Sequence, residues 1–253
     1  RRRRHRMTTT AIDWIAPDWP APTHVRVLST LRAGGVSVGP YASLNLAAHV
    51  GDRPDAVSAN RLLLREAAHL PAEPLWLEQV HGTNVIRHPG DSVAVRADAS
   101  VAFEPGRVCA VMTADCLPVV LTDRGGTRVG VAHAGWRGLL DGVVEATIAA
   151  LGTPPIELFA WLGPAIGSDA FEVGDEVRSA FAARNPAAQE YFQPNERNRY
   201  QADLTGLARL ALAAAGVRSV DGGGWCTHHE SERFFSFRRD GVTGRMATLA
   251  WLA

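Results

Sequence analysis

The chain has 253 residues, of which 46% are hydrophobic, and its formal net charge is zero. This apolar content is enough for a substantial core, and the balanced charge argues against a general nucleic-acid binder, which usually carries a basic excess. No run of ~18 apolar residues and no signal-peptide pattern occur, so we expect a cytoplasmic protein without a membrane partner. The odd count of three cysteines is typical of reduced thiols.

The first ten residues differ from the rest of the chain. They open with RRRRHR ahead of Met7, which predicts a disordered basic tail or a cloning remnant over 1–10. No repeat, low-complexity tract or long linker follows. We therefore expect residues 11–253 to form one domain.

Segments rich in valine, leucine and aromatic residues predict seven strands. In chain order they cover 24–29, 75–80, 108–114, 119–122, 128–132, 157–162 and 246–251. Several of these strands follow one another directly, without a regular alternation of strand and helix. This order favours an α+β fold with mixed sheets over a doubly wound parallel sheet.

Amphipathic patterns predict helices between the strands. Asp52 is a candidate N-cap for the first helix, with Pro54 in its first turn. A second helix presents apolar residues over 140–151 and ends at Gly152.

Two further helices are predicted nearer the C-terminus. One includes Val177 and Phe181, and the other starts at Asp203 and ends at Gly216.

The segment VGVAHAGWRGLL, residues 129–140, is the most informative part of the chain. It leads from a strand pattern through a turn with His133 and Arg137 into a helix. Strand-to-helix turns expose helix N–H groups and commonly hold ligands and catalytic groups. We therefore expect functional residues in this segment.

Three candidate metal ligands stand near predicted strand ends: His81 in EQVHGTNV, Cys116 in TADCLPVV and His133 in VAHAGWRG. Their separations of 35 and 17 residues do not match a zinc finger. Ligands from separate loops are typical of catalytic sites with an open fourth position, and one thiolate with two imidazoles suits Zn²⁺, with copper as a softer competitor. From spacing alone, the alternative is two ordinary loop histidines and a buried thiol.

Cys109 is a weaker candidate. It precedes Cys116 by seven residues, which places the two side chains on opposite faces if one strand is continuous there. Pro118 indicates a nearby bulge or sheet edge.

Several segments together resemble one known family. SLNLAAHVGDRPDAV, LEQVHGTNV, TADCLPVVL, GVAHAGWRGLLDGVVE and CTHHESERFFSFRRDGVTGRMATL resemble the YfiH-like family of laccase-domain proteins, over about residues 24–252. The resemblance implies a four-layer α/β/β/α fold and one zinc ion on His81, Cys116 and His133. Where many relatives read CTxC, this chain reads Cys226, Thr227, His228 and His229, which puts a second-thiol role in doubt.

The family has been described with several activities. They are phosphorolysis of adenosine, inosine, guanosine and methylthioadenosine, deamination of adenosine, copper-dependent phenol oxidation (polyphenol oxidase or laccase), and editing of peptidoglycan precursors. The resemblance therefore implies an enzyme but leaves its reaction open.

Phosphorolysis needs donors for the phosphate anion. Arg137 and Arg238 are the candidates, although either could simply tie loops together through carboxylates. Asn45 is a candidate for orienting the sugar or base, but a loop asparagine often satisfies its own backbone.

Deamination needs an activated water and a carboxylate that shuttles protons. Glu78 and Asp115 are the candidates, with a structural ion pair as the alternative for each. The signature of the cytidine-type zinc deaminases is absent, so the reaction would use a different frame.

A multicopper oxidase would need more histidine ligands than this sequence offers. The chain has nine histidines, one of them in the tail, and no HxH pair, so a multicopper centre is not expected. Cu²⁺ replacing zinc could still give weak phenol oxidation.

A cysteine hydrolase with Cys116 as nucleophile and His133 as base is a third possibility, which zinc bound to the thiolate would disfavour. A scaffold protein with a vestigial zinc is the non-enzymatic alternative. We predict a zinc-dependent purine nucleoside phosphorylase, with adenosine deamination second, binding nucleoside and phosphate. We expect a monomer or weak homodimer without a nucleotide cofactor.

Overall fold

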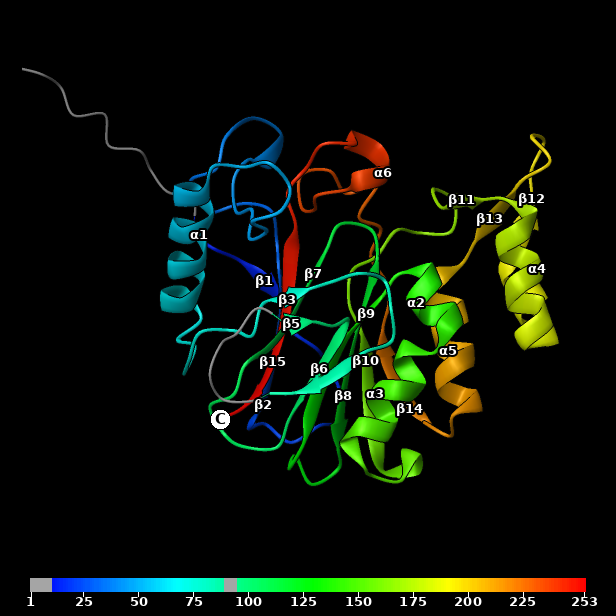
Figure 1. Ribbon diagram of the computed structural model, residues 1–253, viewed down its shortest axis with the longest axis horizontal. Coiled ribbons are helices and arrows are strands. Elements are labelled where there is room, and N and C mark those ends of the chain that lie inside the picture. The colour runs from blue at the N-terminus through cyan, green and yellow to red at the C-terminus, as the bar shows by residue number, and fades with distance from the viewer. Residues whose placement is uncertain (1–10, 89–94) are drawn as a thin grey trace, which may run out of the picture.

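The computed structural model describes residues 11–88 and 95–253, so the predicted tail lies outside the described residues. The fold is mixed α+β, as expected, with two large sheets (Figure 1). The four-stranded sheet has the order β1-β2-β15-β7 and is antiparallel throughout. Its strands are β1 (Trp14–Ile15), β2 (Val25–Thr30), β15 (Met246–Leu252) and β7 (Cys109–Thr113).

The six-stranded sheet has the order β14-β10-β8-β9-β6-β4, with parallel pairs at both edges. Its strands are β14 (Ser219–Gly222), β10 (Leu158–Leu162), β8 (Leu117–Asp123), β9 (Val129–Ala134), β6 (Ala99–Ala102) and β4 (Val85–Arg87). Two small sheets are formed by β3 (Leu77–Glu78) with β5 (Val95–Arg96), and by β11 (Glu172–Val173), β13 (Tyr200–Ala202) and β12 (Phe192–Pro194).

The helices lie outside the two large sheets. Figure 1 shows α1 on one side and α2, α3 and α5 on the other. The helices are α1 (Pro54–Ala67), α2 (Trp136–Asp141), α3 (Val143–Leu151), α4 (Asp175–Arg184), α5 (Leu204–Ala214) and α6 (Phe237–Asp240), with 3-10 turns at Gly39–Tyr41, Pro155–Glu157 and Pro186–Tyr191. No helix in the described ranges is long and apolar enough to cross a membrane.

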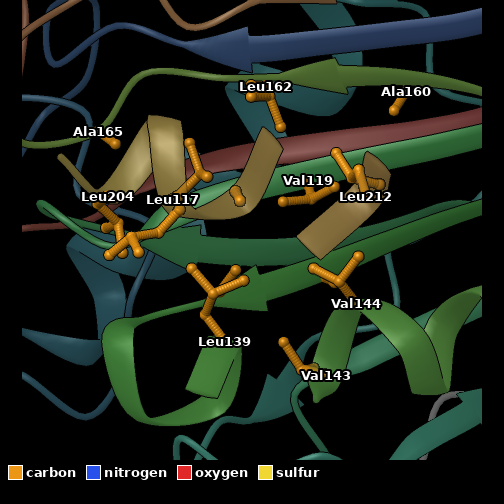
Figure 2. Packing of buried hydrophobic residues seen from close by; sticks show 14 of the residues in the cluster. Leu117, Val119, Leu139, Val143, Val144, Ala160, Leu162, Ala165, Leu204 and Leu212 are labelled. Carbon is orange, nitrogen blue, oxygen red and sulfur yellow. The ribbon is translucent and has the colours of Figure 1, made fainter. Parts of the chain in front are cut away.

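Both faces of the central strands are buried. In β8, Val119 and Leu121 pack toward α3 and α5, whereas Val120 packs toward the four-stranded sheet. Figure 2 shows the helix side of this core, where Leu139, Val144 and Leu212 lie against the strands. Leu64 of α1 belongs to a separate cluster on the outer face of the four-stranded sheet. Helix, sheet, sheet and helix therefore pack in succession, since strand side chains alternate between faces.

The seven predicted strands are confirmed as β2, β3, β7, β8, β9, β10 and β15, with shifted ends. The predicted strand over 75–80 shortens to two residues, which pair with the two-residue β5, and Leu75 forms only an isolated bridge with Cys109. The strands that the sequence did not indicate are short, at two to four residues, so they carry too little periodic pattern to be recognised.

Two helix predictions need correction. Arg53, not Asp52, is the N-cap of α1, because the Asp52 carboxylate accepts instead from the N–H of Arg53 and from Asn45. The helix expected over 140–151 is two helices, since Gly142 at φ 105° separates α2 from α3. The predicted ends at Asp203, which caps α5, and at Gly152 are confirmed.

Cys109 and Cys116 do not share a strand. Cys109 opens β7 and Cys116 precedes β8, and these strands belong to different sheets. The expectation of opposite faces on a continuous strand therefore does not apply. Cys109 is fully buried, as a small apolar residue would be.

Candidate functional site

The structure brings His81, Cys116 and His133 together. Cys116 Sγ lies 3.7 Å from His81 Nε2, the two imidazole centroids are 4.7 Å apart, and the ligating atoms of all three residues lie within 4.8 Å of one another. The hairpin register explains part of this convergence, because Leu117 pairs with Ala134 and Pro118 pairs with His133. We call these three residues the His–Cys–His site.

Asp98, immediately before β6, holds two of the three ligands in place. Its carboxylate accepts from His133 Nδ1 at 2.9 Å and from the backbone N–H groups of Val80, His81 and Gly82 at 2.7–3.1 Å. Those three bonds fix a loop in which His81 adopts φ 61°. A proton on His133 Nδ1 leaves the lone pair of Nε2 available to a metal ion, the usual arrangement in metal sites.

No pattern in the sequence indicated a role for Asp98. The residue is fully buried, and a carboxylate in such a place requires hydrogen-bond partners. A buried acid at the start of the apolar run ADASVA was the available signal, but its partners are far away in the chain.

The charges within the site are coupled. Burial alone would raise the pKa of Cys116, but the adjacent His133 and His81 lower it to about 6. Burial likewise opposes the charged form of His133, yet Cys116 and Asp98 raise its pKa to about 9. For Asp98, burial raises the pKa, and the hydrogen bonds from His133, Gly82 and Val80 outweigh it and hold the pKa below its ordinary value. In the absence of a metal ion, the geometry therefore favours a thiolate beside an imidazolium.

Gly135 leaves room beside the ligands. A Cβ at this position would lie 2.8 Å from His81 Cδ2 and 3.0 Å from Cys116 Sγ. Only a residue without a side chain fits between the end of β9 and these two ligands without moving them.

The donor set fits a zinc ion. Tetrahedral zinc with bonds of about 2.0–2.3 Å requires donor atoms roughly 3.5 Å apart. The 3.7 Å separation between Cys116 Sγ and His81 Nε2 is close to this value. Three protein donors also leave a fourth position for another ligand, as in catalytic sites.

A cavity of about 250 Å³ opens beside the His–Cys–His site. Apart from the three ligands, its lining includes His49, Gln79, Phe237 and Arg245. Gln79 is clamped by two hydrogen bonds to the backbone of Met112, at 2.8 and 2.7 Å, so that part of the wall is fixed.

Arg245, which directly precedes β15, was not indicated by the sequence patterns either. Its Nη1 donates to the carbonyls of Thr243 and Gly244, each at 3.0 Å. Burial lowers the pKa of this guanidinium, which the charges of Cys116 and Asp115 partly oppose. An arginine nevertheless stays protonated at physiological pH, so Arg245 brings a positive charge into the cavity.

Neither predicted anion-binding arginine lines this cavity. Arg137 is exposed and stacks over Trp136 at 4.3 Å. Arg238 donates its backbone N–H to Asp115 at 2.6 Å and its Nη1 to the carbonyl of Glu172 at 2.9 Å. Both make intramolecular contacts in the described structure.

The other predicted residues also lie outside the lining of the cavity. Asn45 is buried. Its amide donates to Ala47 and Asp52 and accepts from the backbone N–H groups of Ala47 and Arg245, so it helps to position Arg245 in the cavity wall. Asp115 accepts from Thr227 and Arg238 through its two oxygens.

Glu78, the remaining predicted substrate-binding residue, lies in β3 and is exposed. Its backbone pairs with Arg96 of β5.

Known proteins resemble this chain over almost its whole length. The family model for multi-copper polyphenol oxidoreductase laccase matches residues 26–253. Purine nucleoside phosphorylases of Pseudomonas aeruginosa and Escherichia coli, the latter named YfiH, are each 54% identical, covering 94% of this chain and 98% of theirs.

Solved structures agree with this relationship. The Neisseria meningitidis protein NMB0706 has a TM-score of 0.90 at 51% identity, covering 94% of this chain and 98% of that one. YlmD from Geobacillus stearothermophilus has a TM-score of 0.88 at 30% identity, covering 96% and 98%.

The fold and the site thus define an α+β protein with a His–Cys–His cluster, at the end of a β-hairpin, that could hold a metal ion. The chain belongs to the multi-copper polyphenol oxidoreductase laccase family, which includes the YfiH proteins, and the resemblance drawn from the sequence is confirmed.

Proposed function

We propose that this chain is a purine nucleoside phosphorylase acting on adenosine, inosine, guanosine and methylthioadenosine, with residues 11–253 as one catalytic domain. The named relatives support the reaction, since they are 54% identical over 98% of their own length. The observation that carries the proposal is the cavity itself. Its lining includes both the cationic Arg245 and the three side chains of the His–Cys–His site, so one substrate pair can contact both.

Phosphorolysis makes specific demands on such a cavity. A phosphate oxygen bonds to C1′ of the ribose while the bond from C1′ to the purine nitrogen breaks, and its electron pair leaves with the base, which takes up a proton. Arg245 is suited to hold the phosphate, because charge-assisted hydrogen bonds are stronger in a partly buried site. His49 is suited to a neutral hydrogen-bonding role, since burial and the charges of Arg245 and Arg61 lower its pKa.

The remaining residues orient the substrate and the metal ligands. His81, Cys116 and His133 would hold a zinc ion, which when bound supplies Lewis-acid polarisation. Phe237 lines the same cavity with a side chain that is 57% exposed, so its ring offers an apolar face on which a purine can stack. Asp98 keeps His133 in the orientation that serves the site.

The test is a direct assay. Metal-replete protein is incubated with inosine and phosphate, and hypoxanthine and ribose 1-phosphate are quantified. We expect equal amounts of both products, and loss of both in Cys116→Ala and His133→Ala. Asp141→Asn, an exposed change on α2, serves as the unaffected control. Failure to form either product from any of the four nucleosides would reject the proposal.

Adenosine deamination is the second reaction that we propose for this site. It has weaker support, because both predicted proton shuttles are placed poorly for it. Asp115 uses its two oxygens within the protein, and Glu78 is outside the cavity lining. Ammonia release from adenosine in the absence of phosphate would support this activity.

A cysteine hydrolase acting on a peptidoglycan precursor is the alternative that a specific observation favours. Asp98 bonds His133, which in turn lowers the pKa of Cys116, as in cysteine–histidine–acid hydrolases. Turnover of a muramyl peptide by zinc-free protein, with no phosphorolysis by the zinc form, would favour it.

The laccase description of the family suggests copper, but the three donors of the His–Cys–His site suit a single copper ion rather than a multicopper centre. The sequence has nine histidines and no HxH pair. Copper in excess of zinc in protein purified without added metal would favour phenol oxidation.

A further inference from the structure

Within residues 11–88 and 95–253, one other group of three side chains could bind a metal ion. Asp169, Cys226 and His229 place their ligating atoms within 4.8 Å of one another. They come from the loop after β10 and the loop after β14. A backbone hydrogen bond of 2.9 Å from Thr227 to Ala165 joins these two loops.

The local contacts fix the position of the sulfur. The N–H of Gly167 donates to Cys226 Sγ at 3.2 Å. His229 Nδ1 lies 3.3 Å from Asp169 Oδ2. The imidazole and the carboxylate therefore already face each other beside the sulfur.

Gly167 keeps the space between two of the donors open. A Cβ at this position would lie 3.0 Å from Cys226 Sγ and 3.1 Å from Asp169 Oδ1. Gly135 has the same relation to Cys116 and His81 in the His–Cys–His site. Both clusters thus have a glycine where a side chain would press on the donors.

We propose that Asp169, Cys226 and His229 form a second metal site, which prefers Zn²⁺ to calcium and magnesium. A thiolate, an imidazole and a carboxylate are zinc donors, whereas calcium and magnesium prefer oxygen ligands alone. The His229–Asp169 contact could exist as a simple surface ion pair, but such a pair contributes little and involves neither the sulfur nor the glycine. The side chains of His229 and Asp169 are 50% and 68% exposed, so this site binds zinc more weakly than the His–Cys–His site.

An ion at this second site would tie together loops that also support the first site. Thr227, the neighbour of Cys226, donates its hydroxyl to Asp115 Oδ1 at 2.7 Å. Ile166 donates its N–H to the carbonyl of the same residue at 2.9 Å. Because Asp115 directly precedes Cys116, the second ion would have a positioning role for the first site.

The experiment isolates the second site in a Cys116→Ser background. Zn²⁺ is titrated into the metal-free protein, and alkylation of Cys226 by a maleimide is followed by mass spectrometry; Cys109 is fully buried and reacts slowly. Co²⁺ provides a second readout through its thiolate charge-transfer absorption. We expect zinc to protect Cys226, and Asp169→Asn or His229→Gln to weaken that protection by at least about 10-fold.

Matched controls remove the same chemical groups elsewhere. Asp141→Asn and His69→Gln each change an exposed side chain outside the cluster, and we expect zinc protection as in the parent. Alkylation of Cys226 at one rate with and without zinc would overturn the proposal, as would equal protection in all four variants.

Metal stoichiometry in the otherwise unchanged chain is an independent test that does not depend on Cys116→Ser folding. After zinc loading and gel filtration, we expect about two zinc ions per chain, and about one in Cys226→Ser. One zinc per chain in both proteins would overturn the proposal whether or not the chain has phosphorylase activity.

Discussion

At the residue scale, Asp98 joins the two histidines of the His–Cys–His site. Its carboxylate bonds the His133 ring and three consecutive N–H groups around His81. Because the residue is fully buried, its charge is satisfied only by these partners. A single side chain therefore sets the orientation of one ligand and the loop of another.

Replacing Asp98 by asparagine tests this role. Asp98→Asn can keep the bond to His133 but loses the charge that favours its orientation, so we expect zinc affinity to fall by about 10- to 100-fold. Competition titration with a chromophoric chelator measures the loss. Asp123→Asn is the control, because Asp123 caps the N–H groups of Thr127 and Arg128 in the β8–β9 turn. Equal affinity in both variants would contradict the assignment.

The thiol of Cys116 should report the charge of its neighbour. Its pKa of about 6 in the metal-free protein predicts that alkylation quickens as pH rises through 6 and levels off near pH 7. In His133→Ala the imidazolium is absent, so the midpoint should move up toward the ordinary thiol value. Measuring iodoacetamide rates against pH in a Cys226→Ser background tests this. Zinc should suppress the reaction at every pH where it binds, and an unshifted midpoint in His133→Ala would refute the coupling.

Replacing Arg245 and replacing Arg137 should have different effects on phosphate binding. Arg245 lines the cavity, so Arg245→Gln should raise the KM for phosphate by about 10- to 100-fold, the equivalent of a ~1.5–3 kcal/mol charge-assisted hydrogen bond. Arg137 stacks on Trp136 outside the cavity lining, so Arg137→Gln should leave it unchanged. Initial rates at varied phosphate, with KM for the nucleoside as internal control, distinguish the two. A raised KM for phosphate in Arg137→Gln, with no change in Arg245→Gln, would instead support the phosphate-binding role that the sequence suggested for Arg137.

At the element scale, the site depends on how β9 passes into α2. His133 lies near the end of β9, and Gly135 is the N-cap of α2, with only Ala134 between them. The absent side chain of Gly135 allows the chain to pass beside His81 and Cys116. Gly142, at the other end of α2, has φ 105° and permits the bend into α3.

Replacing these two glycines should have different effects on zinc binding and stability. Gly135→Ala places a methyl group 2.8 Å from His81 and 3.0 Å from Cys116, so it should weaken zinc binding. Gly142→Ala should instead lower stability by about 1–3 kcal/mol through backbone strain, with zinc affinity retained. Urea unfolding and zinc titration on both variants give the comparison. Zinc affinity reduced more in Gly142→Ala than in Gly135→Ala would oppose this division.

At the scale of the whole molecule, the last strand of the chain completes the site. β15 lies between β2 and β7 in the four-stranded sheet, and Arg245 directly precedes it. His81, Cys116 and His133 belong to segments of the other large sheet and of the loop after β3. The cavity therefore forms only when the two sheets pack against each other through residues such as Val111, Val131 and Ala250.

Zinc removal should lower the stability of the whole fold, because the ion binds only the assembled ligands. Zinc at a hundred times its dissociation constant adds about 2.7 kcal/mol, which corresponds to roughly 5–10 °C in Tm for a chain of this size. Calorimetry with and without a chelator measures the shift. A double variant, Cys116→Ser with Cys226→Ser, removes a ligand from each cluster and should show almost none. An equal shift in that variant would indicate zinc bound elsewhere.

The sequence by itself determined the α+β class, the six longest strands together with the short β3, and the choice of His81, Cys116 and His133 as candidate metal ligands. These depend on local periodicity and on motifs that each span only a few residues. The N-cap of α1 and the break at Gly142 were missed because capping by Arg53 and a bend between two helical patterns leave only weak local signals.

Only the tertiary structure decided which other side chains accompany the ligands. Asp98 bonds His133, which lies 35 residues further along the chain. Arg245 lines the cavity although it is far in sequence from the three residues of the His–Cys–His site. Arg137 and Arg238 have suitable chemistry and motif positions, but packing directs them to Trp136 and Glu172. Contacts between distant segments depend on how sheets and loops pack, and no local sequence pattern records that geometry.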